Sequence, residues 1–296
     1  MQAMILAAGL GTRLLPHTNI RPKALFPILN QPLLLLTIER LKNFGFDHII
    51  VNCHHLKDQI VEKLIGIDGV TIQEEETILG TGGGLRKALP FFRDEPLLIT
   101  NGDIYHTINF FELVQYHQEQ QNQITLAMHH CPRFNKVMTR GGKVTNFDNK
   151  GDHLPLAFTG VHVMDPSLLL DIENDTFSCI VKHYRSLLLA GVEIDCFRVD
   201  DSFWTDMGTV EDYLELHSGL LKGKIPCWLE VGKVRKPFCI AQRAKLPAQV
   251  ELCDWVSIGD AHIENNNTLE RVIVWDKVLI PCGKKLSDML ISEDLK

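Results

Sequence analysis

The feature that most constrains the fold is a regular alternation of short apolar strands and amphipathic helices in the first third of the chain. Strands are expected at residues 3–8, 49–51, 70–73 and 96–100, and helices at residues 32–44, 56–65 and 82–89. Strands that alternate with helices are joined by right-handed crossovers, which make neighbouring strands parallel. The pattern therefore predicts an α/β fold, with a Rossmann-like, mostly parallel sheet and helices on both of its faces.

The alternation becomes less regular between residues 105 and 222. We expect strands at residues 124–128, 158–164 and 194–199, and a helix at residues 178–190. Another helix is expected after Thr209, because a threonine followed three residues later by a carboxylate, here Asp212, is typical of a helix N-terminus. This helix is predicted to end near Leu221.

Beyond residue 225 the helical periodicity disappears and apolar residues recur at six-residue steps. The positions are Ile240, Leu246, Leu252 and Ile258, then Ile263 and Leu269 after a slip of one residue, and Val274, Ile280 and Leu286 after a second slip. A six-residue step is typical of a parallel β-helix, and a set of irregular antiparallel strands is the alternative. We predict one domain over residues 1–224 and a second, small β-helical domain over residues 225–296.

Composition excludes several classes of protein. The chain has 296 residues and a net charge of -7, which argues against broad nucleic-acid binding. The leucine run at residues 33–36 is far shorter than the roughly 18 apolar residues of a membrane span. We see no signal peptide, and the eight cysteines form no Cys-x-x-Cys pair, so buried reduced thiols in a cytoplasmic protein are expected. We expect neither nucleic acid nor a membrane as a partner.

The first strand runs into a glycine-rich turn, MILAAGLGTR, which resembles only part of two known phosphate-binding motifs. A dinucleotide-binding fingerprint needs a third glycine where this chain has Leu14, and an acidic residue where it has Asn30 and Gln31. A P-loop needs a hydroxyl residue after Gly-Lys, and none of the Gly-Lys pairs in the chain has one. Neither a Rossmann dehydrogenase nor a P-loop nucleotidase is favoured.

The turn nevertheless has the chemistry of an anion site. Glycines let the backbone bend tightly and bring its N–H groups close to a ligand, as Gly9 and Gly11 would do here. Arg13 adds a planar set of donors suited to phosphate oxygens, and Lys23 adds a second cation on a rigid turn. Each cation alone would be read as an ordinary solvated charge, but together they favour phosphate binding.

Two sequence blocks then resemble a known family. Residues 6–13, LAAGLGTR, followed by residues 21–27, RPKALFP, are similar to the signature of the sugar-1-phosphate nucleotidylyltransferases. The resemblance extends to about residue 222, which makes residues 1–224 the expected catalytic domain. The tail is similar to the left-handed β-helix of some members, including guanylyltransferases that act on mannose 1-phosphate. The resemblance implies a nucleoside triphosphate and a sugar 1-phosphate as substrates, and a nucleotide sugar and pyrophosphate as products.

The resemblance also implies roles for the charged residues. Arg13 would neutralise the leaving pyrophosphate, and Lys23 would bridge the α-phosphate and the incoming phosphate. Asp103 and Asp206 would hold Mg²⁺, which commonly takes one or two protein carboxylates. Asp103 follows an expected strand, where ligands bind in open α/β sheets, but nothing local shows that the two aspartates meet.

Further binding residues follow from the same resemblance. The nucleotide is expected to contact Leu6, Ala7, Ala8, Gly9, Gly11, Thr12, Arg13, Lys23, Glu75, Thr81 and Gly82. The sugar is expected to contact Asn101, Gly102, Thr159, Gly160 and Lys182. Many relatives carry a Glu-Lys-Pro block where this chain has residues 152–155, so Lys182 or Arg185 would replace the lysine. This departure, with the triple glycine at residues 82–84, is more similar to the N-acetylmuramate-1-phosphate uridylyltransferases, so base and sugar stay open.

Two other functions remain as alternatives. An acyltransferase is one, because β-helix repeats often belong to such enzymes, although the tail offers only His262 as a catalytic histidine. A non-catalytic regulatory subunit with the same fold is the other, but such a chain would be expected to lack some of the charged residues present here. The tail is also expected to serve homo-oligomer formation.

Overall fold

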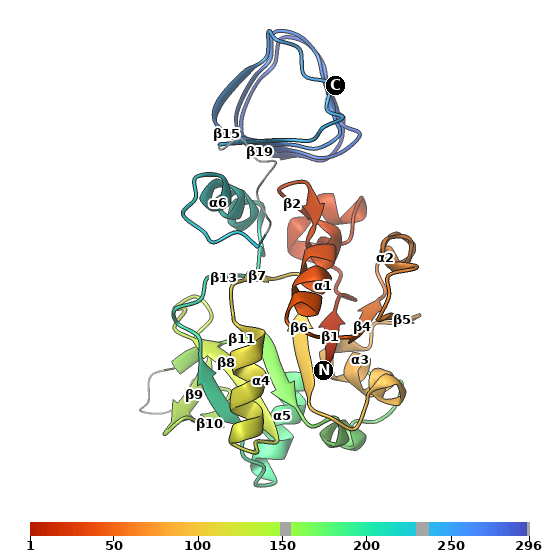
Figure 1. The fold of residues 1–296 in the computed structure, drawn as a ribbon, viewed down its shortest axis with the longest axis vertical. Coiled ribbons are helices and arrows are strands. Elements are labelled where there is room, and N and C mark those ends of the chain that lie inside the picture. The colour runs from red at the N-terminus through yellow and green to blue at the C-terminus, as the bar shows by residue number, and fades with distance from the viewer. Residues whose placement is uncertain (149–154, 229–236, 295–296) are drawn as a thin grey trace. The chain divides into compact units, whose positions relative to one another are not determined.

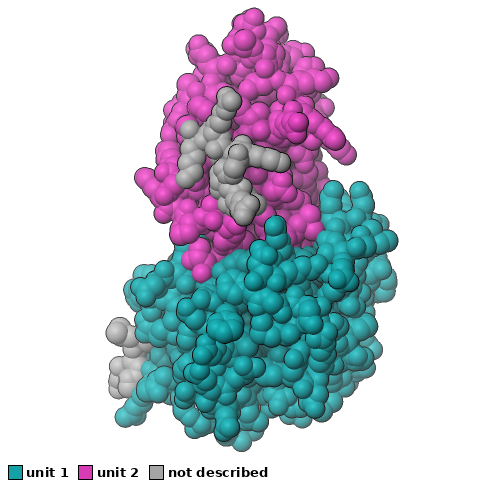
Figure 2. Space-filling model, viewed as in Figure 1, with its two compact units in different colours: residues 1–10, 37–102, 108–204 teal, residues 11–36, 103–107, 205–296 magenta. Residues whose placement is uncertain are grey.

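The computed structural model describes residues 1–148, 155–228 and 237–294. It divides into two compact units, shown in two colours in Figure 2. Unit 1 contains residues 1–10, 37–102 and 108–204, and unit 2 contains residues 11–36, 103–107 and 205–296. These units are defined by contacts and do not follow the predicted boundary at residue 224, so independent folding of the two predicted domains stays a prediction.

Unit 1 is built on one sheet, in which nine strands can be followed among the described residues. The order across it is β5-β4-β1-β6-β11-β8-β12-β10-β9. The strands in chain order are β1 (Gln2–Leu6), β4 (His48–Cys53), β5 (Val70–Glu74), β6 (Leu97–Asn101), β8 (Ile124–His129), β9 (Val137–Arg140), β10 (Lys143–Asn146), β11 (Pro155–Met164) and β12 (Asp195–Arg198).

The prediction of a parallel sheet is confirmed for one half of it and too broad for the other. Strands β5, β4, β1 and β6 are all parallel neighbours. Strand β11 instead runs antiparallel to both β6 and β8, and β10 runs antiparallel to β9 and β12. Among the described residues between β8 and β11 the chain forms strands β9 and β10, and not the helical crossover that a parallel pair would need. The result is a mixed α/β sheet.

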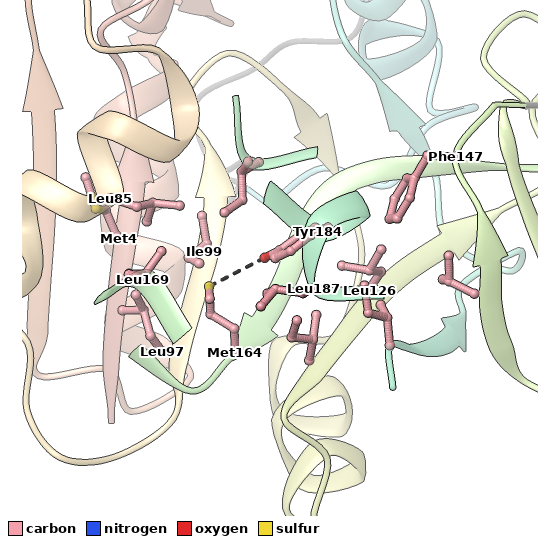
Figure 3. Packing of buried hydrophobic residues seen from close by; sticks show 14 of the residues in the cluster. Met4, Leu85, Leu97, Ile99, Leu126, Phe147, Met164, Leu169, Tyr184 and Leu187 are labelled. Carbon is pink, nitrogen blue, oxygen red and sulfur yellow. Dashed lines mark hydrogen bonds between the residues drawn. The ribbon is translucent and has the colours of Figure 1, made fainter. Parts of the chain in front are cut away.

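The helices cover both faces of the sheet, as predicted (Figure 1). Residues of α3 and α5 join a cluster with Met4, Ile50 and Ile99 on one face, drawn in part in Figure 3. His117 of α4 bonds to Thr125 of β8, whose neighbours Ile124 and Leu126 belong to that cluster. Because neighbouring strand residues point to opposite sides, α4 lies on the opposite face. The helices are α1 (Leu33–Asn43), α2 (Lys57–Leu64), α3 (Gly80–Ala88), α4 (Phe110–Glu119), α5 (Ile180–Leu189) and, in unit 2, α6 (Val210–Leu221).

Two helix ends show how local sequence sets the elements. The predicted cap of α6 is confirmed, because Thr209 and Asp212 bond reciprocally to each other's backbone N–H groups. Helix α4 was not predicted, although its cap is equally local. The side chain of Asn109 accepts hydrogen bonds from the N–H groups of Phe111 and Glu112. An asparagine before an apolar run was therefore the signal for this helix.

Unit 2 begins with a segment of tight turns, residues 11–36. Three 3-10 turns (Thr12–Leu14, His17–Asn19 and Lys23–Leu25) lead into a hairpin of β2 (Pro27–Ile28) and β3 (Gln31–Pro32). Leu29 and Asn30 connect the two strands and both have positive φ, at 48° and 68°, which is the conformation of a type I′ hairpin turn. A further short pair is β7 (Tyr105–His106) with β13 (Trp204–Thr205).

The predicted six-residue pattern corresponds to parallel strands. Strands β14 (Phe238–Ile240), β15 (Glu251–Ile258), β17 (Thr268–Val274) and β19 (Lys285–Ile291) form one parallel sheet, and β16 (His262–Ile263) pairs in parallel with β18 (Leu279–Ile280). Among the described residues, the antiparallel alternative is wrong for this segment. Ile258 lies opposite Val274, and Val274 opposite Ile291, so the slips in the sequence pattern preserve the stacking. Figure 1 shows the segment as a three-sided coil.

Within the described ranges, no helix combines the length and the apolar character needed to cross a membrane.

Candidate active site

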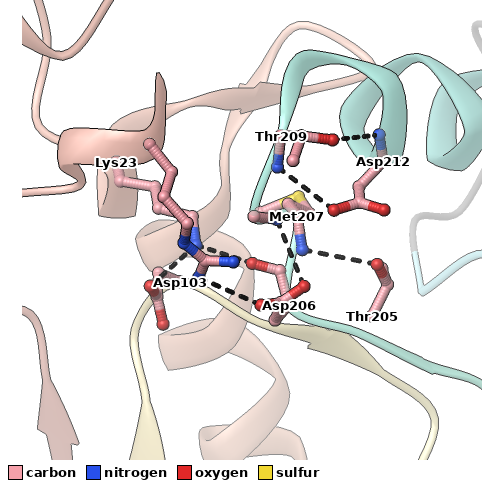
Figure 4. A network of polar contacts seen from close by, with 9 residues as sticks. Lys23, Asp103, Thr205, Asp206, Met207, Thr209 and Asp212 are labelled. Atoms are coloured by element: carbon pink, nitrogen blue, oxygen red, sulfur yellow. Dashed lines mark hydrogen bonds and ion pairs between the residues drawn. The ribbon is translucent and has the colours of Figure 1, made fainter. Parts of the chain in front are cut away.

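A cluster of charged side chains in unit 2 contains Lys23, Asp103 and Asp206 (Figure 4). The Nζ atom of Lys23 lies 2.8 Å from Oδ2 of Asp103 and 2.6 Å from the backbone oxygen of Asp206. The lysine side chain is only 6% exposed, whereas that of Asp103 is 40% exposed. Lys23 therefore acts as a buried bridge between two segments that are far apart in the sequence.

Arg13 completes the cluster. Its Nη2 atom donates to Oδ2 of Asp206 at 3.1 Å, and its side chain is 58% exposed. Gly208 makes this approach possible, because a Cβ there would collide with Nη1 of Arg13 and lie 2.9 Å from Oδ2 of Asp206. Gly11 has φ of 62°, and a Cβ there would lie 2.8 Å from Thr18, so the glycine turn is required for this path of the chain.

Three separate segments supply these side chains. Lys23 starts a 3-10 turn directly after Pro22, and Asp103 stands two residues after the end of β6. Asp206 lies in a turn before α6, where Oδ1 accepts from the N–H of Gly208 at 3.2 Å and Met207 has φ of 44°. The structure thus brings the two aspartates and two cations together, which local sequence did not establish. Their individual catalytic roles stay predictions.

The donor set suits a divalent cation and an anion together. Asp103 and Asp206 offer carboxylate oxygens, the ligands that Mg²⁺ prefers, and Mg²⁺ commonly completes its shell with water and substrate oxygens. The described residues contain no group of three or more His, Cys, Asp or Glu placed to hold a metal ion.

The predicted nucleotide-binding residues of unit 1 follow strand β1. Oδ1 of Asn52 accepts from the N–H of Ala7 at 2.8 Å, and the oxygen of Leu6 accepts from the N–H of Gly102 at 2.8 Å. Ala8 is half-buried, and Gly9 is exposed with no atom within 4 Å of the place a Cβ would occupy. In unit 2, Thr12 is exposed and begins the first 3-10 turn.

Glu75 lies in a different environment from the one expected of a base contact. It is 1% exposed, and its Oε1 atom accepts from Nδ2 of Asn52 at 2.7 Å and from Nε2 of Gln73 at 3.4 Å. Its Oε2 atom lies 3.4 Å from the N–H of Leu79, which accompanies the start of α3. The carboxylate is thus bonded within unit 1, and its role toward a base stays a prediction. Sequence reasoning missed Asn52, whose place near the carboxyl end of β4 was the available signal.

The glycine run at residues 82–84 has a structural reason of its own. The N–H of Gly82 donates to the oxygen of Ser178 at 2.8 Å, and a Cβ on Gly82 would lie 2.9 Å from the Ser178 hydroxyl oxygen. The Thr81 hydroxyl accepts from the N–H of Ile180 at 2.9 Å, at the start of α5. The glycines therefore allow α3 to pack against the residues before α5, and contact of Thr81 and Gly82 with a base is untested.

The predicted sugar-binding residues of unit 1 fall into two groups. Asn101 and Gly160 lie close together, because a Cβ on Gly160 (φ of 82°) would be 2.5 Å from Nδ2 of Asn101. The Thr159 hydroxyl is buried and donates to the oxygen of Ala127 at 2.8 Å. Lys182 is exposed on α5, whereas Arg185 is paired with Asp148. The block at residues 152–155, where the lysine of relatives is absent, falls mostly outside the described residues.

Two relatives with assigned names are nucleotidyltransferases that act on sugar 1-phosphates. The chain is 26% identical to the mannose-1-phosphate guanylyltransferase of Mycobacterium tuberculosis, over 96% of the chain and 82% of that protein. It is 28% identical to the UTP–glucose-1-phosphate uridylyltransferase of a Synechocystis strain, over 76% of the chain but only 64% of that enzyme's length. The two names differ in both base and sugar.

A solved structure and a family profile place the fold. The inositol-1-phosphate CTP transferase of T. maritima superposes with a TM-score of 0.62 at 18% identity, covering 76% of this chain and 98% of that one. At that identity the likeness concerns the fold alone. The sequence profile described as nucleotidyl transferase matches residues 2–223, which is most of the chain. This chain is therefore a member of the nucleotidyl transferase family.

Proposed function

We propose that the protein transfers a nucleotidyl group from a nucleoside triphosphate to a sugar 1-phosphate. The observation that carries this proposal is the meeting of Arg13, Lys23, Asp103 and Asp206 in one cluster of unit 2. Family membership and the names of the relatives support the same reaction class. Both substrates are polyanions, so a site that joins cations to metal-binding carboxylates addresses the main barrier.

The reaction proceeds by attack of a phosphate oxygen of the sugar 1-phosphate on the α-phosphorus of the triphosphate. The new oxygen–phosphorus bond forms as the bond between the α-phosphorus and its bridging oxygen breaks, and pyrophosphate leaves with the electron pair. Lys23 is buried and fixed by two oxygens, so it is suited to hold the α-phosphate and the attacking phosphate close together. Arg13 is exposed, and its guanidinium is suited to neutralise the departing pyrophosphate.

Asp103 and Asp206 are the residues that would hold Mg²⁺. When bound, the ion would neutralise phosphate charge and orient the triphosphate. Lys23 pairs with Asp103 and Arg13 with Asp206, so both carboxylates lie beside a cation that can face the phosphates. The expectation of Mg²⁺ rests on this donor set and on the chemistry of polyphosphates.

The base and the sugar require direct measurement. Purified protein with Mg²⁺ would be incubated with each of four nucleoside triphosphates and a panel of sugar 1-phosphates, and pyrophosphate release would be followed. One pair is expected to give nucleotide sugar and pyrophosphate in equal amounts. The Asp103→Asn variant would report contaminating activity, and the Asp288→Asn variant would serve as a matched control on a distant aspartate.

The same assay separates the alternatives. Release of pyrophosphate only with a sugar 1-phosphate supports the proposed transfer. Silence over the whole panel would contradict it and favour a regulatory subunit. A parallel reaction with an added acyl donor tests the acyltransferase, and consumption of that donor without pyrophosphate release would favour it.

For the C-terminal segment we propose a short left-handed β-helix. Three observations support it: the parallel pairing, the stacking of Ile258, Val274 and Ile291 in neighbouring strands, and the three-sided coil in Figure 1. Homo-oligomer formation through this segment and a cytoplasmic location remain expectations from the sequence. Light scattering of the full chain at several concentrations tests the first, and a fractionation of cells tests the second.

A further inference from the structure

The segment that carries Arg13 and Lys23 has contacts inside unit 2 with the C-terminal strands. By this name we mean β14 to β19 together with the turns that connect them. Nδ1 of His17 lies 2.7 Å from the hydroxyl oxygen of Ser292, just after β19. The His17 ring also meets the Trp275 ring edge-on, with centroids 6.1 Å apart. The cation-bearing segment is therefore attached to the end of the chain before Lys23 is reached.

A second attachment lies two residues before Lys23. The guanidinium of Arg21 stands 4.6 Å from the centroid of the Trp275 ring, and its Nη2 atom lies 3.5 Å from Oδ2 of Asp276. Trp275 is 1% exposed, and Phe26 packs edge-on against it with centroids 4.7 Å apart. Lys23 thus lies between two residues, Arg21 and Phe26, that share one tryptophan of the C-terminal strands.

The hairpin turn after Lys23 supplies a third attachment. Nδ2 of Asn30 donates to the oxygen of Ile258 at 2.7 Å, and its Oδ1 accepts from the Ser257 hydroxyl at 3.3 Å. Both partners belong to β15. Asn30 therefore joins the hairpin turn to β15 through both polar atoms of its amide.

The Asp206 side of the cluster is connected to the same strands. Helix α6, which begins shortly after Asp206, contacts β15, β17 and β19. Lys222 at its end lies 2.8 Å from Oδ1 of Asp254 in β15. Nε2 of His217 accepts from the N–H of Leu29 at 3.3 Å, which joins α6 to the hairpin turn.

We propose that the C-terminal strands position the cations of the candidate active site, with Arg21, Trp275 and Asp276 as positioning residues. The proposal rests on the transfer function proposed above. Each contact alone is modest, since partly exposed ion pairs contribute little to stability. Their effect on rate is larger, because a misplacement of about 1 Å at a reacting group costs up to roughly a hundred-fold. The tail then has a catalytic role beyond assembly.

The test compares two charged contacts on the same C-terminal strands. Arg21→Met keeps an apolar stem over Trp275 but removes the cation, and Arg21→Lys keeps a cation there. The control Asp288→Asn breaks the pair with Arg271, whose atoms lie 2.7 Å apart, without touching residues 11–36. The measurements are kcat and KM for the triphosphate, the thermal midpoint, and hydrogen exchange of amides in residues 12–30.

For Arg21→Met we expect kcat to fall by about ten- to a hundred-fold with little change in KM. Amide exchange in residues 12–30 is expected to become faster, Arg21→Lys should recover much of the rate, and Asp288→Asn should match the wild type. If Arg21→Met does not fold, Trp275→Phe and Asp276→Asn are measured in its place, with smaller changes in the same direction.

Unchanged kcat and exchange in Arg21→Met would overturn the proposal. A rise in KM alone would also overturn it, because Arg21 would then contact the substrate directly. The exchange measurement needs no turnover, so it separates this proposal from the proposed function. Wild-type protein that is inactive on every substrate pair contradicts the function, whereas faster exchange in Arg21→Met still supports the positioning role.

Discussion

The two sets of predicted ligand-binding residues, one in each unit, differ in how their polar groups are used. In unit 2, Arg13 and Asp103 remain partly exposed while each holds one partner of opposite charge. In unit 1, Glu75 and Thr159 are buried, and their side chains bond to other groups of the protein. Unit 2 therefore keeps charged groups accessible to solvent, whereas this part of unit 1 uses polar residues to fix its own loops.

Glycines show the same difference. Gly208 and Gly11 permit close approach of charged or cation-bearing groups in the candidate site. Gly82 and Gly83 permit close approach of α3 to Ser178 and Thr176. A glycine-rich motif thus indicates that another group comes close to the backbone. That group is Arg13 at Gly208 in unit 2, and the segment before α5 at Gly82 and Gly83 in unit 1.

The largest effect is expected from the carboxylates of unit 2. Asp206→Asn and Asp103→Asn should each lower turnover by about a hundred- to a thousand-fold, because each removes a charge where polyphosphate charge must be balanced. Steady-state pyrophosphate release and thermal unfolding would be measured together, with Asp288→Asn as the control. Full activity in either variant would show that its carboxylate is not needed to hold a metal ion. The contrast drawn between the two units would then be wrong.

The next effect concerns the buried cation. Lys23→Ala should lower kcat by about ten- to a hundred-fold and raise KM for the triphosphate, because it removes the bridge between Asp103 and the backbone of Asp206. The comparison variant is Lys143→Ala, which removes a pair with Glu193 in unit 1. Equal kinetics in both variants would show that the essential cation lies elsewhere.

A stability effect is expected in unit 1. A Cβ on Gly83 would collide with the backbone oxygen of Thr176, whereas one on Gly9 would meet no atom within 4 Å. Gly83→Ala should therefore lower the free energy of unfolding by about 1–3 kcal/mol, as overpacking does. Gly9→Ala should change it by less than about 0.5 kcal/mol. Urea unfolding checks both. Equal stability of the two variants would contradict a structural role for the glycine run at residues 82–84.

The smallest effect is a pH dependence in unit 2. Burial lowers the pKa of His217 to about 4, and only a neutral Nε2 accepts the hydrogen bond from Leu29. The unfolded chain takes up this proton near the usual pKa of 6.5, so stability present above that pH is lost as pH falls from 6.5 toward 4. The loss at about pH 5.5 is roughly 1 kcal/mol for this group.

Urea unfolding at neutral pH and at about pH 5.5 measures this loss. In His217→Gln the difference between the two conditions should shrink. Buried His117 and His162 of unit 1 have pKa values lowered to about 4 and about 3, so they add pH dependence of the same sign. An unchanged difference in the variant would show that His217 does not titrate in this way.

Much of the architecture could be predicted from local pattern. The strands and helices of the first hundred residues and the cap at Thr209 are confirmed. The six-residue pattern of the tail corresponds to parallel strands, although Ile240 is 39% exposed. A strand was predicted at residues 158–164, but the position of β11 in the sheet could not be predicted. Its neighbours β6 and β8 are determined by packing and not by its own sequence. Helix α4 was missed although Asn109 gave a local signal.

The sequence by itself determined which chemical groups are present and where the chain can bend: two cations beside a glycine turn, two aspartates in short turns, and apolar steps of fixed length in the tail. Only the tertiary structure decided that Asp103 and Asp206 meet across Lys23, that Glu75 is buried, and that Trp275 lies under Arg21. The reason is the separation along the chain over which each interaction acts. Periodicity and capping depend on neighbours along the chain, whereas burial and charge pairing depend on which distant segments pack together.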